Sequence, residues 1–239
     1  MTIEDFKGQI SLIKDGFGNP TEGLQEICKI FLGEFHIEVD RWILWPTEVE
    51  AYCYCDNFKD VYVHRNVLQM NRFGKLYVHR HPDNHTADGT PKGWAGIDIC
   101  LSDSEGFYFG MLIRAAKINS LAEDPTIGPY KLYRTIKQDI PLDYYKTLEM
   151  NVALVPNDEP MPEPVFFSKR IGLKLKEEDF EGRFLHEKLR AVRAVSLNKY
   201  AYKCKEELFE GRAETPEGMS DIDYAKDILG YVPANLKAK

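Results

Sequence analysis

The run RWILWPTEVEAYCYC at positions 41–55 is the feature that most constrains the fold of this chain. Its β-branched and aromatic residues favour extended backbone over most of its length. Further extended segments, separated by turn residues, lie at 34–40, 74–81, 94–102 and 107–116. We therefore expect a core that is rich in β-strands.

Helical patterns lie before and after these strands. Apolar residues recur at helical spacing over 21–33, a weaker pattern covers 128–137, and Ser220 is a candidate cap for a helix at 220–232. Four prolines between positions 156 and 164 are expected to exclude regular structure there. Strands and helices together predict an α+β fold in a single domain, 1–239.

The charge of the chain limits its partners. Lys and Arg total 31 and Asp and Glu total 38, which gives a net charge of −7. This balance excludes a polybasic coat, and binding to nucleic acid would depend on a local basic face. The phosphate-loop, dinucleotide-binding and nucleophile-elbow motifs are absent from the sequence, so we expect no nucleotide cofactor.

Cysteine usage and the start of the chain bear on its location. The chain has five cysteines, an odd number, and its first 16 residues include acidic side chains and no unbroken apolar stretch. No segment approaches the roughly 20 apolar residues of a membrane span. We expect an intracellular, cytoplasmic protein with reduced thiols and no membrane partner.

Alternation along 47–55 separates two kinds of side chain. One face of the strand carries small, core-like residues, whereas the other carries Glu48, Glu50, Tyr52 and Tyr54. A carboxylate two residues from a tyrosine suits a catalytic base beside a stacking surface, although a solvent-exposed face would have the same pattern. Arg114, within an apolar strand, either pairs with a carboxylate or lines a cleft, or else it lies at the strand end and reaches solvent.

A metal site is a weaker alternative. His79, His81 and His85 lie close together in sequence and, with Cys53 and Cys55, offer a set of metal-ligand types. Their spacing differs from the spacings of zinc fingers and zinc ribbons. We therefore expect polar loop histidines and no metal.

Several fragments, taken in order, resemble the alkyladenine (3-methyladenine) DNA glycosylase family of single-domain methylpurine glycosylases. The likeness extends over about 24–196, whereas 197–239 forms a C-terminal extension with no counterpart. The matching fragments are Phe31-Leu32-Gly33, Glu48-Val49-Glu50-Ala51-Tyr52, His64 with Arg65-Asn66 and Met70, Gly74-Lys75-Leu76-Tyr77-Val78, Met111-Leu112-Ile113-Arg114-Ala115, and Arg170-Ile171-Gly172.

The resemblance implies a curved, mostly antiparallel sheet and a monofunctional glycosylase that removes a damaged, alkylated or deaminated purine from DNA. Glu50 would activate a water that attacks the sugar C1′. Arg114 would hold the water and the carboxylate and keep Glu50 ionised. Tyr52 and His64 would stack on the flipped base, which offsets the cost of extruding it. No cofactor is implied.

The sequence also departs from the family. His79 stands where the family has a second pocket tyrosine, and Asp98 stands where it has an asparagine that helps to exclude guanine. A carboxylate there would accept a hydrogen bond from the guanine 2-amino group, so the base preference could differ. The loop 80–93 is longer than the family's DNA-wedging hairpin and has no matching tyrosine.

The expected partner is double-stranded DNA with a damaged purine, bound by a monomer. Phosphates are contacted mainly by Lys and Arg side chains. The candidate DNA contacts are Arg65, Lys75, Arg80, His81, Lys92, Trp94, Lys131, Arg134, Lys169 and Arg170.

Two other interpretations stay open. The same fold could act on a free nucleoside or another small ligand, as the acidic balance and the missing hairpin tyrosine would suit. Alternatively, the chain could be a non-catalytic binding protein in which Glu50 and Arg114 form a structural ion pair.

Overall fold

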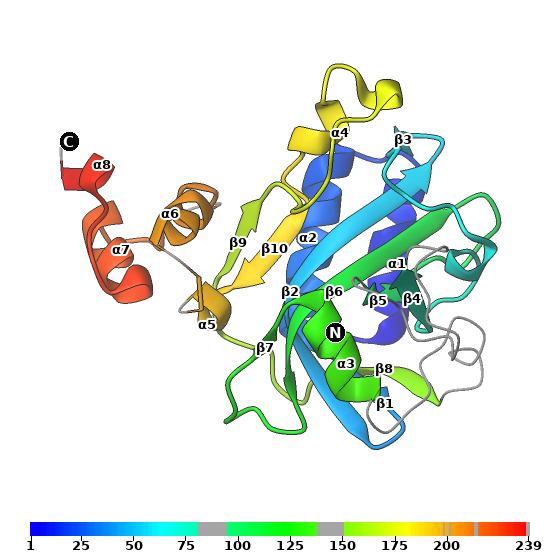
Figure 1. The fold of residues 1–239 in the computed structure, drawn as a ribbon, viewed down its shortest axis with the longest axis horizontal. Coiled ribbons are helices and arrows are strands. Elements are labelled where there is room, and N and C mark those ends of the chain that lie inside the picture. Colours follow the sequence, from blue (N-terminus) through cyan, green and yellow to red (C-terminus); the bar gives the residue numbers. More distant parts are fainter. Residues whose placement is uncertain (81–94, 138–150, 198, 201, 213–214, 238–239) are drawn as a thin grey trace.

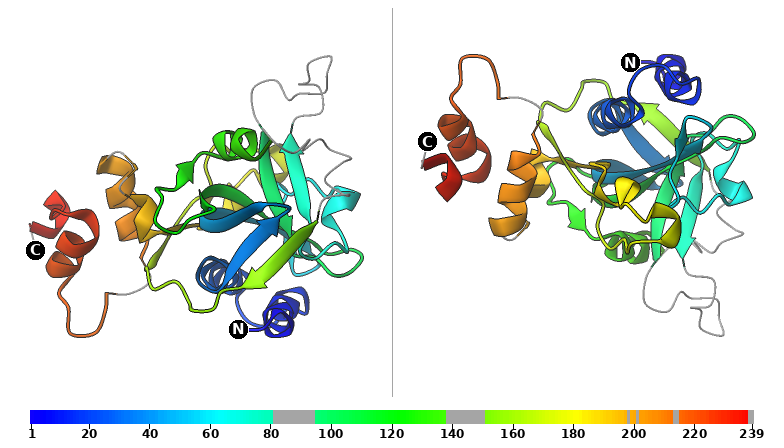
Figure 2. Two further views of the ribbon diagram at one scale, coloured as in Figure 1. Left: turned by 90° about the horizontal axis from the view of Figure 1, so that it is seen from below. Right: turned by 90° about the horizontal axis from the view of Figure 1, so that it is seen from above.

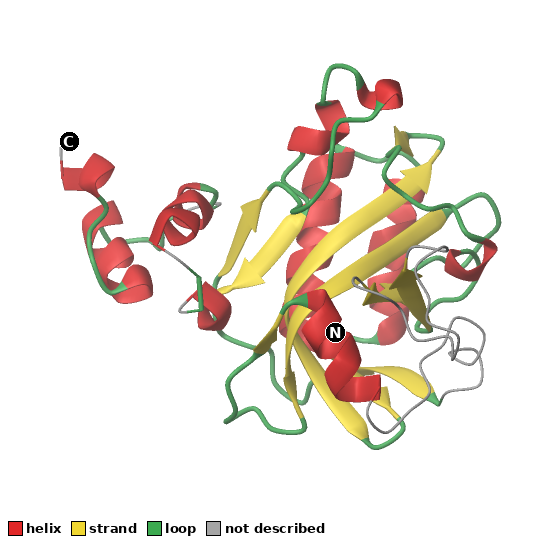
Figure 3. Ribbon diagram, in the orientation of Figure 1, coloured by secondary structure: helices red, strands yellow, loops and turns green. Residues whose placement is uncertain are grey.

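The computed structural model describes residues 1–80, 95–137, 151–197, 199–200, 202–212 and 215–237. In this part of the chain, antiparallel strands form one curled sheet with helices on both sides (Figures 1 and 3). This confirms the predicted α+β fold with a curved antiparallel core. The strands are β1 (Phe35–Val39), β2 (Trp42–Cys55), β3 (Phe58–Lys59), β4 (Leu76–Arg80), β5 (Ala95–Cys100), β6 (Tyr108–Ile118), β7 (Thr126–Ile127), β8 (Val152–Pro156), β9 (Val165–Ser168) and β10 (Arg190–Arg193).

The helices lie mainly at the two ends of the chain. Among the described helices, none combines the length and the apolar character that crossing a bilayer requires. They are α1 (Ile3–Lys14), α2 (Pro20–Glu34), α3 (Pro129–Lys137), α4 (Arg183–His186), α5 (Ala194–Leu197), α6 (Tyr202–Glu210), α7 (Asp221–Leu229) and α8 (Ala234–Lys237), with 3-10 turns at Val67–Gln69 and Glu177–Asp179.

Strand β2 organises the sheet because it pairs with β6 along most of its length and also with β1, β3 and β10. The main strand order is β4-β5-β6-β2-β1-β8, and β9 pairs with β10 beside it. Both faces of β2 are buried from Thr47 to Cys53. The alternative interpretation, in which the face of β2 with Glu48 and Glu50 is exposed to solvent, is therefore wrong.

Helices α1 and α2 cover one face of the sheet, which we call the helix-covered face. Val49, Ala51 and Cys53 of β2 point into this layer and belong to the main hydrophobic core. Helix α1 was not predicted from the sequence, although Thr2 and Asp5 form a capping box that begins it. Apolar side chains of α2 fill the same layer at helical spacing.

The opposite face, which we call the polar face, carries the alternate β2 residues. Helix α3 crosses it over β5 and β6 (Figure 1). Gly96 permits this approach, because a Cβ there would lie 2.6 Å from Leu112 Cδ1 and 3.2 Å from Pro129 Cβ.

Two short strands flank the proline-rich stretch directly, one on each side. Pro156 ends β8, which is an edge strand, and β9 begins directly after Pro164. Proline removes one backbone donor, and at an edge or a strand end that donor is not needed by the sheet. The expected absence of regular structure is therefore confirmed for 157–164, whereas Pro156 itself belongs to a strand.

The C-terminal helices lie at the end of the molecule remote from β4 and β5 (Figure 2). A second hydrophobic cluster joins them to the sheet. Phe166 of β9 and Val192 of β10 pack there with Leu197, Leu208, Phe209 and Tyr224. Helix α7 begins at the predicted cap, because Ser220 Oγ accepts a hydrogen bond from the Asp223 amide.

Candidate active site

A row of side chains crosses the polar face from β10 to β4. The antiparallel register places Arg190 opposite Glu50, Glu50 opposite Leu112, Leu112 opposite Asp98, and Asp98 opposite Tyr77. Directly opposite residues of an antiparallel pair point to the same face. The register therefore brings two residues that are far apart in sequence, Glu50 and Asp98, into one row.

Glu50 lies at the centre of this row and is fully buried. Its Oε1 accepts a hydrogen bond from the Ile171 amide at 2.7 Å and lies 3.2 Å from Arg114 Nη1. Its Oε2 accepts a hydrogen bond from the Tyr52 hydroxyl at 2.9 Å. Three donors from three separate segments thus hold one carboxylate.

Glu48 is a second fully buried carboxylate on the same face of β2. Its Oε1 accepts hydrogen bonds from Arg114 Nε at 3.0 Å and from Arg190 Nε at 2.7 Å. Its Oε2 accepts a hydrogen bond from the Tyr200 hydroxyl, which lies in the C-terminal extension. Two carboxylates and two guanidinium groups therefore lie within one hydrogen-bonded cluster.

An irregularity in the β2–β6 pairing aims Arg114 at both carboxylates. Glu48 pairs with Ala115 and Val49 pairs with Ile113, so that Arg114 is the additional residue between these pairs. Such bulges redirect a side chain relative to a regular ladder. The structure confirms the interpretation in which Arg114 pairs with a carboxylate, because it contacts both Glu48 and Glu50.

Burial determines the ionisation of this site. Desolvation raises the pKa of Glu50 above its ordinary value, although Arg114, the Ile171 amide and the Tyr52 hydroxyl each lower it. Arg114 thus acts on Glu50 in the expected direction, but burial outweighs its effect and leaves the pKa raised. Burial and the neighbouring Glu50 also raise the pKa of Tyr52, which keeps its hydroxyl protonated as a donor.

The predicted base-stacking residues, Tyr52 and His64, lie on the polar face, but they do not face each other across an open space for a base. The Arg170 guanidinium lies 4.6 Å from the centre of the Tyr52 ring, on which a flipped base was expected to stack. His64 is exposed, and its Nδ1 lies 3.4 Å from the Tyr77 hydroxyl at the β4 end of the row. The backbone of His79 pairs with Gly96, while its side chain lies outside the described residues.

The candidate DNA contacts other than Arg170 fall into three groups. Arg65, Lys75, Lys131, Arg134 and Lys169 are exposed, whereas Arg80 is described only as a backbone member of β4. His81, Lys92 and Trp94, with the rest of loop 81–94, lie outside the described residues.

Arg170 was wrongly predicted as a phosphate contact. Its side chain is fully buried, and its Nη1 lies 2.5 Å from Asp60 Oδ2. Its Nη1 also donates to the Ala51 carbonyl at 3.1 Å, and its Nη2 donates to the Phe184 carbonyl at 3.0 Å. Arg170 therefore anchors segment 170–173 against β2 instead of facing solvent.

Sequence reasoning missed four participants: Glu48 as a buried acceptor, Arg190, Tyr200 and the Ile171 amide. The alternation placed Glu48 on the correct face, but nothing in the sequence indicated its partners. Arg190 and Tyr200 lie 142 and 152 positions from Glu48.

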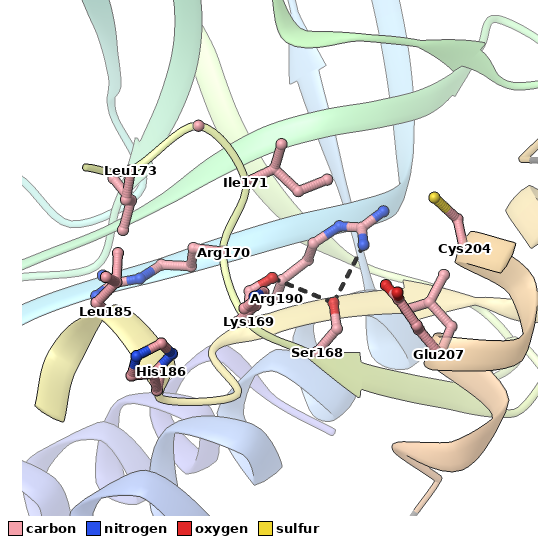
Figure 4. Close-up of a pocket in the computed structure, with 12 residues that line it drawn as sticks. Ser168, Lys169, Arg170, Ile171, Leu173, Leu185, His186, Arg190, Cys204 and Glu207 are labelled. Carbon is pink, nitrogen blue, oxygen red and sulfur yellow. Dashed lines mark hydrogen bonds between the residues drawn. The ribbon is translucent and has the colours of Figure 1, made fainter. Parts of the chain in front are cut away.

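A pocket of about 410 Å³ lies between segment 168–173 and helix α6 (Figure 4). Its lining includes Ile171 and Arg190, which donate to Glu50 and Glu48. Within the described ranges, no three His, Cys, Asp or Glu side chains are grouped to hold a metal ion. Cys53 and Cys55 belong to the helix-covered face. Comparisons of the chain with models of protein families, with curated proteins and with solved structures found no match.

Proposed function

We propose that this protein is a DNA glycosylase that flips a damaged purine out of the duplex and hydrolyses its N-glycosidic bond. The observation that supports it best is the Glu50 carboxylate, buried on the polar face and held by Arg114, Tyr52 and the Ile171 amide. Glycosidic cleavage proceeds through an oxocarbenium-like centre, which a nearby carboxylate stabilises.

In this proposal Glu50 takes a proton from the attacking water. Its raised pKa makes the ionised carboxylate a stronger base than an exposed glutamate would be. Arg114, which Glu48 orients from the other side, supplies a positive charge within 3.2 Å of Glu50. No metal or organic cofactor takes part.

Access to Glu50 requires a local movement. Segment 170–173 covers the carboxylate, and its Ile171 donates the backbone hydrogen bond. Ile171 itself is 45% exposed and Gly172 has a φ of +83°, so the segment is a surface turn over a buried group. The deoxyribose would reach Glu50 by displacing this turn.

A base-release assay tests the proposal. The full chain is incubated with methylated DNA and with duplexes that carry a single hypoxanthine or ethenoadenine. We expect the parent protein to release a modified purine and Glu50→Gln to release none, because glutamine keeps the size of the side chain and lacks the base. Glu38→Gln, an exposed position on β1, is the matched control and should be as active as the parent.

Binding is measured separately by fluorescence anisotropy on a duplex that contains an abasic site. Glu50→Gln should still bind this duplex. Release of base by Glu50→Gln at the parental rate would exclude Glu50 as the base. Absence of release and of binding by the folded parent protein would exclude the glycosylase and direct the search to free nucleosides.

A further inference from the structure

The pocket beside the carboxylates has the size of a small-molecule site. Its volume of about 410 Å³ lies within the range of about 300–1,000 Å³ that is usual for such sites. One wall is segment 168–173, and the other is the face of helix α6 that carries Cys204, Glu207 and Leu208. Leu173, Leu185 and Leu208 give the pocket an apolar lining.

Arg190 supplies the pocket with a buried and incompletely used guanidinium. The residue is only 4% exposed. Its Nε donates to Glu48, its Nη1 donates to Ser168 Oγ at 3.1 Å, and the guanidinium lies 5.1 Å from the centre of the Tyr200 ring. Its Nη2 has no hydrogen-bond partner among the described residues. Figure 4 shows this guanidinium pointing toward the space between Ile171 and Cys204.

Burial of an unsatisfied donor is unfavourable, and an acceptor from a ligand would remove that cost. Guanidinium groups recognise carboxylates and phosphates with charge-assisted hydrogen bonds. Lys169 lines the same pocket and adds a second positive charge at its exposed side.

We propose that this pocket binds a small organic anion, with its carboxylate or phosphate group on Arg190 and its apolar body against the leucines. The site adjoins the proposed catalytic carboxylates, because Arg190 also donates to Glu48 and Ile171 also donates to Glu50. Glu207 lies on the opposite wall. Its negative charge repels an anion and therefore weakens anion binding by the parent protein.

Calorimetric titration of the full chain with three ligands that share a phenyl ring tests the proposal. Phenyl phosphate and benzoate carry the two anionic groups, and benzyl alcohol carries none. We expect the preferred anion to bind with a Kd on the order of 1 mM or below and at least about tenfold more tightly than benzyl alcohol. The order of the two anions distinguishes a phosphate site from a carboxylate site.

Variants on α6 locate the binding without disturbing the contact between Arg190 and Glu48. Cys204→Phe fills the pocket and should weaken binding at least about tenfold. Glu207→Gln removes the repelling charge and should tighten binding about threefold or more. Glu210→Gln on the same helix, outside this pocket, is the control and should not change the affinity.

Thiol labelling gives a second measurement. Cys204 is exposed, whereas the other four cysteines are buried. The Cys53 thiol lowers the pKa of Cys55 to about 6, but Cys55 is 3% exposed and reacts only after local opening. A Cys204→Ser variant therefore identifies the fast phase, which a saturating anion should slow about tenfold.

Two results would overturn the proposal. One is that neither anion binds more tightly than benzyl alcohol. The other is that Cys204→Phe binds the anion as well as the parent does while the anion fails to protect Cys204.

Discussion

Glu48 and Glu50 place two buried carboxylates two residues apart on one face of β2, with Arg114 in contact with both. The neighbouring Glu48 raises the pKa of Glu50, and the Arg114 cation lowers it. Arg114 is therefore the residue on which the protonation state of Glu50 most depends. Changing it should be visible as a shift in pH dependence, beyond a loss of rate.

We expect Arg114→Gln to move the acid limb of base release to higher pH. The wild-type limb should have its midpoint above 4.5, because burial raises the pKa of Glu50 from that value. Removing the Arg114 charge takes away an interaction that lowers this pKa, so the midpoint rises further. Arg114→Lys keeps the charge and should shift it less. A pH–rate profile of kcat/KM checks both variants. An unchanged acid limb in Arg114→Gln would show that Arg114 does not control the ionisation of Glu50.

Glu50→Gln should gain stability relative to the parent as the pH rises. Between about pH 4.5 and the raised pKa, folded Glu50 holds a proton that the unfolded chain has released, so the stability of the parent falls through this interval. Glutamine does not titrate. Thermal melts from about pH 4 to pH 8 should show the Tm difference, variant minus parent, increasing with pH.

The exposed control Glu38→Gln should show no such trend in Tm. A Tm difference for Glu50→Gln that decreases with pH would mean that Arg114 outweighs burial and that the pKa of Glu50 is lowered.

Glu50 and Arg114 were identifiable from sequence because the alternation of β2 and the resemblance in order of fragments both point to them. Arg190 and Tyr200 were not, because each joins the site through contacts across more than 140 positions. Arg170 belongs to a fragment that matched the family, but it is buried in an ion pair with Asp60 and not exposed to contact a phosphate. Local patterns predict which face a residue occupies, but not which distant residue it meets there.

The same limit applies to whole elements. The long strands β2 and β6 and the amphipathic helix α2 were predicted, because their own residues carry the pattern. Strands β9 and β10 have four residues each and depend on pairing with each other and with β2. Such short strands have too few residues for a period to be recognised.

Gly211 is the residue on which the docking of α6 depends. A Cβ at this position would lie 1.9 Å from the Phe167 carbonyl oxygen of β9. The atoms closest to this Cβ are backbone atoms of Phe167 and Leu208, which cannot rotate away as a side chain could. Gly211→Ala must therefore displace α6 from the sheet. We expect a loss of about 1–3 kcal/mol or more in the free energy of unfolding, measured by urea denaturation.

Gly8→Ala is the matched control for that experiment. Gly8 lies within α1, and a Cβ there would meet nothing within 4 Å. Alanine is the better helix former, so this variant should gain about 0.5–1 kcal/mol. Equal stability of the two variants would show that α6 does not rely on this close approach.

At the scale of the whole molecule, three arginines of the polar face form buried ion pairs and do not point into solvent. Arg114, Arg170 and Arg190 are each paired with a buried carboxylate. With a net charge of −7, any attraction for DNA must come from exposed cations that are grouped on one side. Helix α3, which crosses the polar face, carries two of them in Lys131 and Arg134.

Charge reversal on α3 should therefore weaken DNA binding more than the same reversal elsewhere. The double variant Lys131→Glu/Arg134→Glu is compared with Lys29→Glu/Lys226→Glu on α2 and α7, where the cations are also exposed. Both pairs change the net charge by the same amount, so the comparison isolates position. Each lost phosphate contact should reduce the slope of log K against log salt by about 0.9. Anisotropy titrations across salt concentrations measure it, and identical slopes for the two double variants would remove α3 from the DNA-binding face.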